Sequence, residues 1–197
     1  MNKIAFSFDE KLFLALNGRH SEFLDQVMLL ASNLFSSIPI FILIAVIATR
    51  YYKKQGYSYP LANSLLMICV LLIGFLFCLF VLPPTLSGLF ERQRPCFNPS
   101  ISNWVRLVGE DCNTTRSSFA VRPCITFCVT SFFLFTLKTD FPISKAALIF
   151  WSLMVAYSRI YLGIHYPFNV LIAVLIGFFC GYMTSRLYFY LKDDVFG

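Results

Sequence analysis

Five stretches of this sequence are apolar over nearly the length needed to cross a lipid bilayer. A spanning helix takes about 20 predominantly apolar residues, because each residue adds about 1.5 Å across a hydrocarbon core roughly 30 Å thick. The stretches are Leu34–Tyr51, Leu61–Leu82, Ser118–Leu137, Ala146–Tyr161 and Pro167–Tyr190. Helices satisfy their own backbone hydrogen bonds in lipid. With 58% hydrophobic and 13% charged residues, the sequence predicts an all-α polytopic membrane bundle of about five transmembrane helices and excludes a soluble domain.

The first 33 residues differ from these stretches. Asp9–Asn17 and Ser21–Ala31 carry apolar residues at helical spacing beside charges, which is typical of helices lying at the membrane interface. Acidic residues interrupt the start of the chain, so no cleavable signal is expected. We expect one membrane domain over residues 1–197, with N-terminal interfacial helices in 1–33, a transmembrane bundle in 34–190 and a long non-cytoplasmic loop in 83–117.

Lysine and arginine fall on different sides of the predicted bundle. One set of loops and tails holds Arg50, Lys53, Lys54, Lys138, Lys145, Arg186 and Lys192, which marks it as cytoplasmic under the positive-inside tendency. The other side holds Arg92, Arg94, Arg106, Arg116, Arg122 and Arg159. Guanidinium groups bind phosphate through two parallel hydrogen bonds, so this cluster predicts an anionic ligand. The net charge of +6 is divided between two faces, which argues against a nucleic-acid partner.

Two of the seven cysteines lie in the long loop on the non-cytoplasmic side, where the compartment is usually oxidising. We therefore expect Cys96 and Cys112 to form a disulfide that pins the loop. The alternative is a pair of free thiols. The other five cysteines fall inside predicted spans and act most simply as small apolar fillers.

Three segments on that side carry the residues with chemical potential. They are Leu89–Pro95, Thr115–Ala120 and Ser158–Asn169. An arginine and a histidine at the edge of hydrocarbon are costly unless they face protein or water, so they indicate a functional site; interfacial anchoring is the alternative. The last segment contains the pattern S-R-x5-H in the context YLGIHYP, and the first ends in Arg94-Pro95. In these residues the sequence resembles the type-2 phosphatidic acid phosphatase family.

The resemblance implies a role for each matching residue. His165 would be the nucleophile that attacks phosphorus, and Arg94 and Arg159 would hold the phosphate oxygens. Ser117 and the backbone near Ser118 would supply a further ligand. Phosphoryl transfer depends mainly on positioning and on neutralising charge at the equatorial oxygens. The family implies no cofactor, and two distant histidines form no recognisable metal site.

The resemblance also implies a lipid substrate and a cellular location. Small bacterial members share this order of spans and motifs, so we expect the bacterial inner (plasma) membrane, with several passes and a site facing the periplasm or the exterior. A phosphorylated membrane lipid is the expected ligand.

The sequence departs from the family at several positions. Ser87 replaces the lysine of the first motif, and Arg116 replaces the proline of the second. Phe119 stands where the family has its general-acid histidine, and Asn169 stands for the aspartate that orients the nucleophile. General acid catalysis contributes typically about 10²–10⁴ in rate, and an equivalent Asp-to-Asn change in serine proteases costs about 10⁴. Turnover is thus expected to be roughly 10⁶–10⁸ lower if the two losses multiply.

Positive charge is nevertheless retained. Arg116 and Arg122 offset the missing lysine, and Arg122 lies near the start of a membrane helix, where it should face the polar pocket. The alternative is that Arg122 extends to the lipid head groups. The only other histidine, His20, lies between the two N-terminal helices and is expected at a surface.

Three functions fit these residues. The first is an impaired relative, a pseudoenzyme or membrane-complex subunit, that binds a lipid phosphate or pyrophosphate. The second is an active metal-independent lipid phosphatase or phosphotransferase that forms a phosphohistidine at His165. The third is a structural membrane subunit with a vestigial pocket, whose partners are other membrane proteins.

Overall fold

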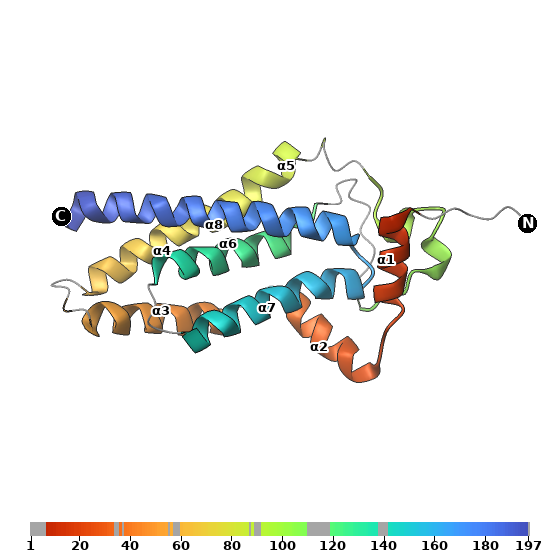
Figure 1. Cartoon of the computed structure of the whole chain (residues 1–197), viewed down its shortest axis with the longest axis horizontal. Coiled ribbons are helices and arrows are strands. Elements are labelled where there is room, and N and C mark those ends of the chain that lie inside the picture. Colours follow the sequence, from red (N-terminus) through yellow and green to blue (C-terminus); the bar gives the residue numbers. More distant parts are fainter. Residues whose placement is uncertain are drawn as a thin grey trace, which may run out of the picture.

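The computed structural model describes residues 7–33, 36, 38–54, 56, 60–86, 88, 92–109, 119–137 and 142–196, and regular structure in these residues is helical. Two short helices, α1 (Phe8–Asn17) and α2 (Glu22–Ser32), lie together at one end of the molecule (Figure 1). Five longer apolar helices run between that end and the opposite one. They are α3 (Ile38–Lys54), α4 (Pro60–Leu76), α6 (Val121–Thr136), α7 (Pro142–Tyr161) and α8 (Pro167–Phe196).

The predicted all-α membrane bundle is confirmed, and each predicted span overlaps one of the five long helices. Three segments among the described residues are long and apolar enough to cross a membrane: Leu61–Leu86, Pro142–Tyr161 and Pro167–Asp194. Helices α3 and α6 have 17 and 16 residues, so they are shorter than the usual span. The two N-terminal helices also form as predicted. Each begins at a serine whose side chain accepts a backbone N–H, Ser7 for α1 and Ser21 for α2, which is a stabilising N-cap.

The second span is not one regular helix. After α4 the chain continues as a π-helical turn, Phe77–Val81, and then as α5, Leu82–Leu86. Pro83 and Pro84 lie in this last turn. Proline removes a backbone donor and clashes with the preceding turn, and a local change of helical pitch is a common way to absorb such a defect.

Helices α6 and α8 pack closely because two glycines lie at the contact. A Cβ atom at Gly177 would fall 2.1 Å from the carbonyl oxygen of Cys124, and one at Gly181 would fall 2.1 Å from that of Cys128. Glycines four residues apart share one helix face and let two backbones approach in a membrane. Ser131 adds a hydrogen bond from its Oγ to the Phe178 carbonyl oxygen at 2.9 Å. This contact fixes the relative position of the two helices whose starts border the predicted site.

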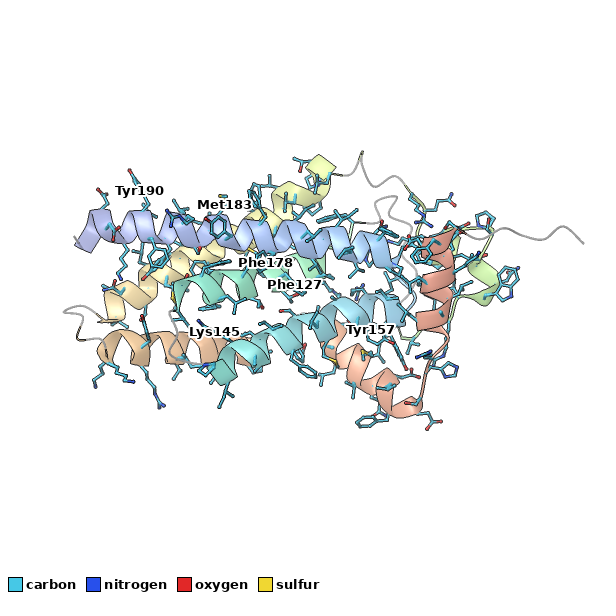
Figure 2. All side chains as sticks on the ribbon, in the orientation of Figure 1. Phe127, Lys145, Tyr157, Phe178, Met183 and Tyr190 are labelled. Carbon is cyan, nitrogen blue, oxygen red and sulfur yellow. The ribbon has the colours of Figure 1, made fainter. Side chains whose placement is uncertain are left out.

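The exterior of the bundle is apolar, as expected for a surface in contact with lipid. Many large side chains point outward from the long helices, among them Met183 and Tyr190 on α8 (Figure 2). Inside, polar side chains pair with one another: Thr130 Oγ1 and Ser152 Oγ lie 2.6 Å apart between α6 and α7. Such an arrangement is inverted relative to a soluble protein and matches a lipid solvent.

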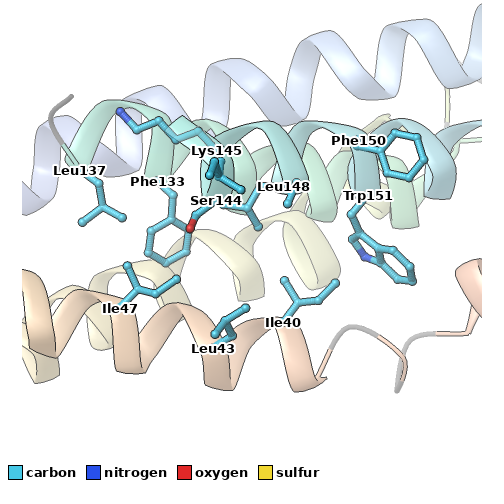
Figure 3. A pocket seen from close by; sticks show the side chains of 12 residues that line it. Ile40, Leu43, Ile47, Phe133, Leu137, Ser144, Lys145, Leu148, Phe150 and Trp151 are labelled. Atoms are coloured by element: carbon cyan, nitrogen blue, oxygen red, sulfur yellow. The ribbon is translucent and has the colours of Figure 1, made fainter. Parts of the chain in front are cut away.

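A cavity of about 420 Å³ opens between α3, α6 and the first half of α7 (Figure 3). Its lining is almost entirely apolar, with Ser144 and Lys145 as the polar exceptions. Because it borders the start of α7, it is remote from the end of α7 that carries Arg159. This cavity is therefore not the predicted phosphate site.

Candidate functional site

The turn between α7 and α8 places Arg159 directly beside His165. The carbonyl oxygen of Arg159 accepts the backbone N–H groups of Ile164 at 3.2 Å and His165 at 3.1 Å, and Gly163 N–H donates to the Ile160 carbonyl oxygen at 3.1 Å. This is the Schellman pattern that ends many helices, and it requires a left-handed residue. Gly163 fills that position with φ +88°. The spacing of the S-R-x5-H motif is thus the spacing of a closed helix end.

Tight packing adds a second reason for glycine at this turn. A Cβ atom at Gly163 would lie 2.6 Å from the carbonyl oxygen of Arg106 in the long loop. Any larger residue would push the loop away from the turn. The loop and the turn are therefore built as one unit.

The polar side chains of the third family motif, in Ser158–Asn169, are buried. Arg159 is 5% exposed, His165 is 4% exposed and Asn169 is 7% exposed. Asn169 lies in the first turn of α8, four residues after His165. Burial of a guanidinium beside an imidazole is expensive unless both belong to a polar site.

Arg122 and Arg159 meet at one hydroxyl group. Ser32, at the end of α2, accepts hydrogen bonds from Arg159 Nη1 and, at 2.8 Å, from Arg122 Nη1 on its Oγ. Arg122 Nη1 also donates to the Ser32 carbonyl oxygen. The guanidinium of Arg122 thus binds Ser32 beside Arg159, and its place in a phosphate pocket stays a prediction.

Of the other residues singled out in the sequence, the structure describes some and leaves others outside the described ranges. Phe119 precedes α6, is 3% exposed and belongs to the apolar core. Arg94 is half-buried and directly precedes a short 3₁₀ turn, Pro95–Phe97, in the long loop. The predicted ligands Arg116, Ser117 and Ser118 lie outside the described residues.

Cys96 is held in a disulfide, whereas Cys69, Cys78, Cys124, Cys128 and Cys180 are free. Cys112, the partner expected from the sequence, lies outside the described residues, so the pairing itself stays a prediction.

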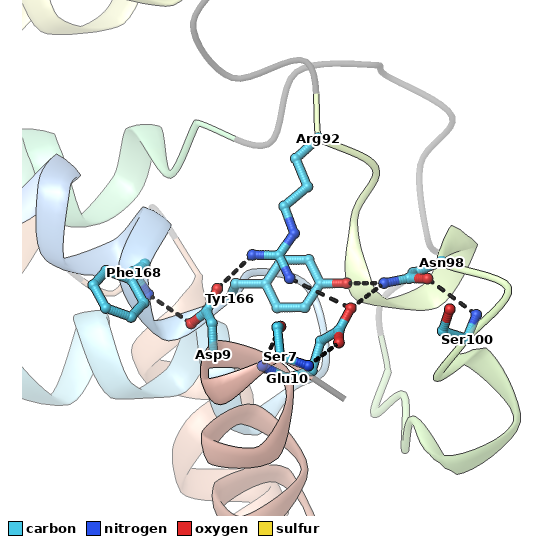
Figure 4. Close-up of polar contacts among 8 residues, drawn as sticks. All are labelled: Ser7, Asp9, Glu10, Arg92, Asn98, Ser100, Tyr166 and Phe168. Carbon is cyan, nitrogen blue, oxygen red and sulfur yellow. Dashed lines mark hydrogen bonds and ion pairs between the residues drawn. The ribbon is translucent and has the colours of Figure 1, made fainter. Parts of the chain in front are cut away.

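A first polar cluster fastens the long loop to the start of α8 (Figure 4). Asp9 on α1 accepts the Phe168 backbone N–H at 3.1 Å and pairs with Arg92 at 2.5 Å. The Arg92 guanidinium stacks 3.6 Å from the ring centre of Tyr166, and Asn98 donates to the Tyr166 hydroxyl at 2.8 Å. One carboxylate of α1 therefore caps the helix that carries Asn169 and holds the loop that carries Arg94.

A second polar cluster joins the loop to α2 and α7. Asp25 receives both Nη atoms of Arg106, at 2.9 and 2.5 Å, and the hydroxyl of Tyr161 at 2.6 Å. Hydrogen bonding from Arg106 lowers the pKa of Asp25 from its usual 3.8 to about 2. The buried side chain of Asn17 completes the link by donating to the carbonyl oxygens of Arg106, at 2.9 Å, and Tyr161, at 2.8 Å.

The residues that sequence reasoning missed are Asp9, Asn17 and Asp25 in these clusters and Ser32 beside Arg122 and Arg159. Their partners lie 81 to 159 positions away in the chain, so no motif spacing points to them. The one available signal was acidic residues on amphipathic helices expected beside an arginine-rich loop. Arg92 and Arg106, which the sequence grouped with the other arginines, form ion pairs here and serve the architecture of the site.

The motifs and the helical arrangement agree with comparisons to known proteins. Residues 64–193 match the model of the PAP2 superfamily. The chain therefore belongs to this superfamily, the type-2 phosphatidic acid phosphatases that its motifs resemble, and hence to a family of membrane lipid phosphatases.

Two individual proteins are similar over nearly the whole chain. A lipid A 4'-phosphatase of Porphyromonas gingivalis is 25% identical over 191 residues, covering 96% of this chain and 76% of the relative. The crystal structure of Aquifex aeolicus LpxE superimposes with a TM-score of 0.60 at 18% identity, covering 94% of this chain and 99% of that one. The structural likeness shows that the fold is shared.

Proposed function

We propose that this protein binds the phosphate or pyrophosphate group of a membrane lipid at the end of the bundle where α6, α7 and α8 meet α2, and that it turns the lipid over very slowly. The observation that carries the proposal is the meeting of Arg122 and Arg159 on one buried hydroxyl, next to the turn that holds His165. Two guanidiniums in a site of low dielectric favour a multiply charged anion.

Slow turnover follows from the side chains at two positions. Phe119 is buried among apolar residues and has no proton to donate to a leaving group. Asn169 can accept a hydrogen bond from imidazole, but it lacks the charge that would stabilise a cationic intermediate and fix one tautomer. An impaired enzyme that keeps its phosphate ligands acts as a lipid-binding subunit.

The proposed orientation places this site outside the cytoplasm. Arg50, Lys53, Lys145 and Lys192 lie on α3, α7 and α8 toward the opposite end of the bundle, as Figure 1 lets the reader follow. The positive-inside tendency assigns that end to the cytoplasm. The protein would then cross the inner membrane several times, with the arginine site facing the periplasm.

A phosphate-release assay combined with mass spectrometry of retained lipid tests the proposal. The purified protein should carry a phosphorylated lipid, and its release of phosphate from phosphatidate, lipid A or a polyprenyl diphosphate should equal that of His165→Ala. The double variant Phe119→His/Asn169→Asp should release phosphate at least about 100-fold faster, because it regains a general acid and an orienting carboxylate. Robust release by the unmodified protein would reject the impairment.

The lipid A 4'-phosphatase among the relatives favours a second candidate function. In that case the chain is an active, metal-independent lipid phosphatase, in which His165 attacks phosphorus and water later hydrolyses the phosphohistidine. Without a general acid, such an enzyme should strongly prefer diphosphate lipids, whose leaving group needs no proton. Equal rates on monophosphate and diphosphate lipids would exclude this version.

A further inference from the structure

The apolar cavity between α3, α6 and α7 is elongated along the helix axes. On α7 its lining follows one helix face, from Ser144 to Trp151 at the spacing i and i+7. On α3 it follows one face as well, through Ile40, Leu43 and Ile47. Residues at this spacing lie above one another on a helix. Each stripe covers about two turns, so the two walls run side by side for about 10 Å at 1.5 Å per residue.

The two ends of the cavity differ in polarity. Ser144 and Lys145 line the end near the start of α7, and Figure 3 shows the Ser144 oxygen on the side of α7 that borders the cavity. Trp151 and Ile40 line the other end, about halfway along α7. In a spanning helix the start lies near the membrane surface and the middle lies in hydrocarbon. The cavity therefore has the polarity of an amphiphile, with one polar end and an apolar interior.

The cavity is accessible from the lipid-facing exterior of the bundle. Leu43 on α3 and Ile143 on α7 both line it, and they are 57% and 85% exposed. The main helical neighbour of α3 is α4, so helix packing does not fill the space toward α7. The lining of an unfilled space loses van der Waals contacts. In a bilayer, the surrounding molecules that can restore these contacts are acyl chains.

We propose that this cavity is a lipid site separate from the phosphate site, and that it binds an acyl chain of a phospholipid from the leaflet at the lysine-bearing end of the bundle. The polar head of this lipid lies at the level of Ser144, and the chain extends between α3 and α7 to Trp151. The chain supplies the packing that holds α3 against α6 and α7. This inference goes beyond the proposed function, because it requires neither phosphate recognition nor turnover at His165.

Trp151 can report whether a chain occupies the cavity. The sequence has two tryptophans, so Trp104→Phe, in the long loop, leaves Trp151 as the only one. Bromine atoms on a lipid chain quench indole fluorescence on contact. The Trp104→Phe protein, purified in detergent, is titrated with phosphatidylcholine that carries dibrominated chains. We expect saturable quenching, which unbrominated phosphatidylcholine should reverse by competition.

A larger side chain inside the cavity provides the blocking variant. Ala147 lines the cavity, whereas its exposed neighbour Ala146 on α7 lies outside the lining. In the Trp104→Phe background, Ala147→Phe should weaken the saturable binding by about 10-fold or more, because a filled apolar site tolerates extra volume poorly. Ala146→Phe is the matched control, since it adds the same side chain to the exterior, and it should bind the brominated lipid as the parent protein does.

The remaining outcomes contradict the proposal. Quenching that rises in proportion to the brominated lipid in the micelles, equally in Ala147→Phe and Ala146→Phe, would mean that Trp151 meets bulk lipid alone. Absence of quenching would show that no chain enters. If Ala147→Phe does not fold, Leu43→Phe on the opposite wall decides: weakened saturable quenching supports the site, and unchanged quenching overturns it.

Discussion

The arginines at this end of the molecule are bonded in two different ways. Arg92 and Arg106, the outer arginines, pair with carboxylates of α1 and α2. Arg122 and Arg159, the inner arginines, converge on the hydroxyl of Ser32. Outer arginines whose charge is already matched can hold the loop and the turn in place, whereas two inner guanidiniums around a neutral oxygen suit a ligand that brings negative charge. Arginine therefore stabilises the architecture at the two outer positions and suits ligand binding at the two inner positions.

The largest loss of ligand affinity is expected for Arg159→Ala. In the proposed complex, Arg159 and the lipid phosphate form a buried, hydrogen-bonded charge pair. Truncating one partner of such a pair costs about 2–5 kcal/mol of binding free energy, so affinity for dioctanoyl phosphatidate should fall about 30-fold or more. The melting temperature of the ligand-free protein should fall less than in Arg106→Ala, because relief of repulsion between two neighbouring positive charges offsets part of the lost contacts. Calorimetry and thermal unfolding measure the two effects. If Arg159→Ala instead lost much stability and kept normal affinity, Arg159 would be an architectural residue and not a ligand of the phosphate.

Arg106→Ala should give the opposite pattern. It removes both bonds to Asp25 and separates the long loop from α2, so the melting temperature should fall by several degrees. The affinity of the folded fraction for phosphatidate should stay close to that of the wild type. Arg19→Ala, at an exposed position after α1, is the matched control for removing one positive charge and should leave both values unchanged.

Low pH should selectively weaken the ion pair between Asp25 and the outer arginine Arg106. The pKa of Asp25 is lowered from 3.8 to about 2 by Arg106, so its contribution to stability is complete above pH 3.8 and is lost as the pH falls toward 2. Thermal unfolding between pH 5 and 2 should show this slope. Asp25→Asn and Arg106→Ala should each flatten it, and the double variant should flatten it no further. An unaltered slope in Asp25→Asn would assign the acid sensitivity to other carboxylates.

The smallest effect is expected from Arg92→Lys. The Arg92 side chain is 38% exposed. An ion pair with this much exposure to solvent contributes about 1 kcal/mol or less to stability. Lysine keeps the charge opposite Asp9 but cannot stack as a plane on Tyr166. We expect a shift in melting temperature below that of Arg106→Ala. The same exchange in the inner layer, Arg159→Lys, should cost far more affinity, because a point charge cannot replace a fork.

The sequence predicted the helices better than their contacts. Apolar length located all five long helices, and apolar residues at helical spacing beside charges located α1 and α2. The π-helical turn at Phe77–Val81 was not predicted, although Pro83 and Pro84 follow it, because its own composition is that of any apolar helix. Gly177 and Gly181 lie at a spacing known for close packing, yet the spacing does not say which helix is approached.

The candidate site was predictable where it is local. Arg159 and His165 belong to one closed helix end and Asn169 follows in the first turn of α8, so the motif spacing describes their geometry. Arg122 was expected to face the pocket because a charge at the start of a membrane helix needs a polar neighbour. Ser32, Asp9 and Asn17 could not be assigned, because hydrogen bonds across more than 80 residues depend on how the helices pack. Ordinary polar side chains on amphipathic helices look the same whether they face water or a site.

The position of Ser32 also has a practical consequence for anyone who shortens this chain. The family match covers residues 64–193, and that interval holds His165, both inner arginines and both outer ones. It omits Asp9, Asp25 and Ser32, whose oxygens accept hydrogen bonds from these arginines, and Asn17, whose side chain donates to the Arg106 carbonyl oxygen. A fragment cut at the family boundary would keep every motif yet lose the N-terminal residues that accept hydrogen bonds from four basic side chains. Expression trials and chimaeras should therefore keep the first 33 residues attached.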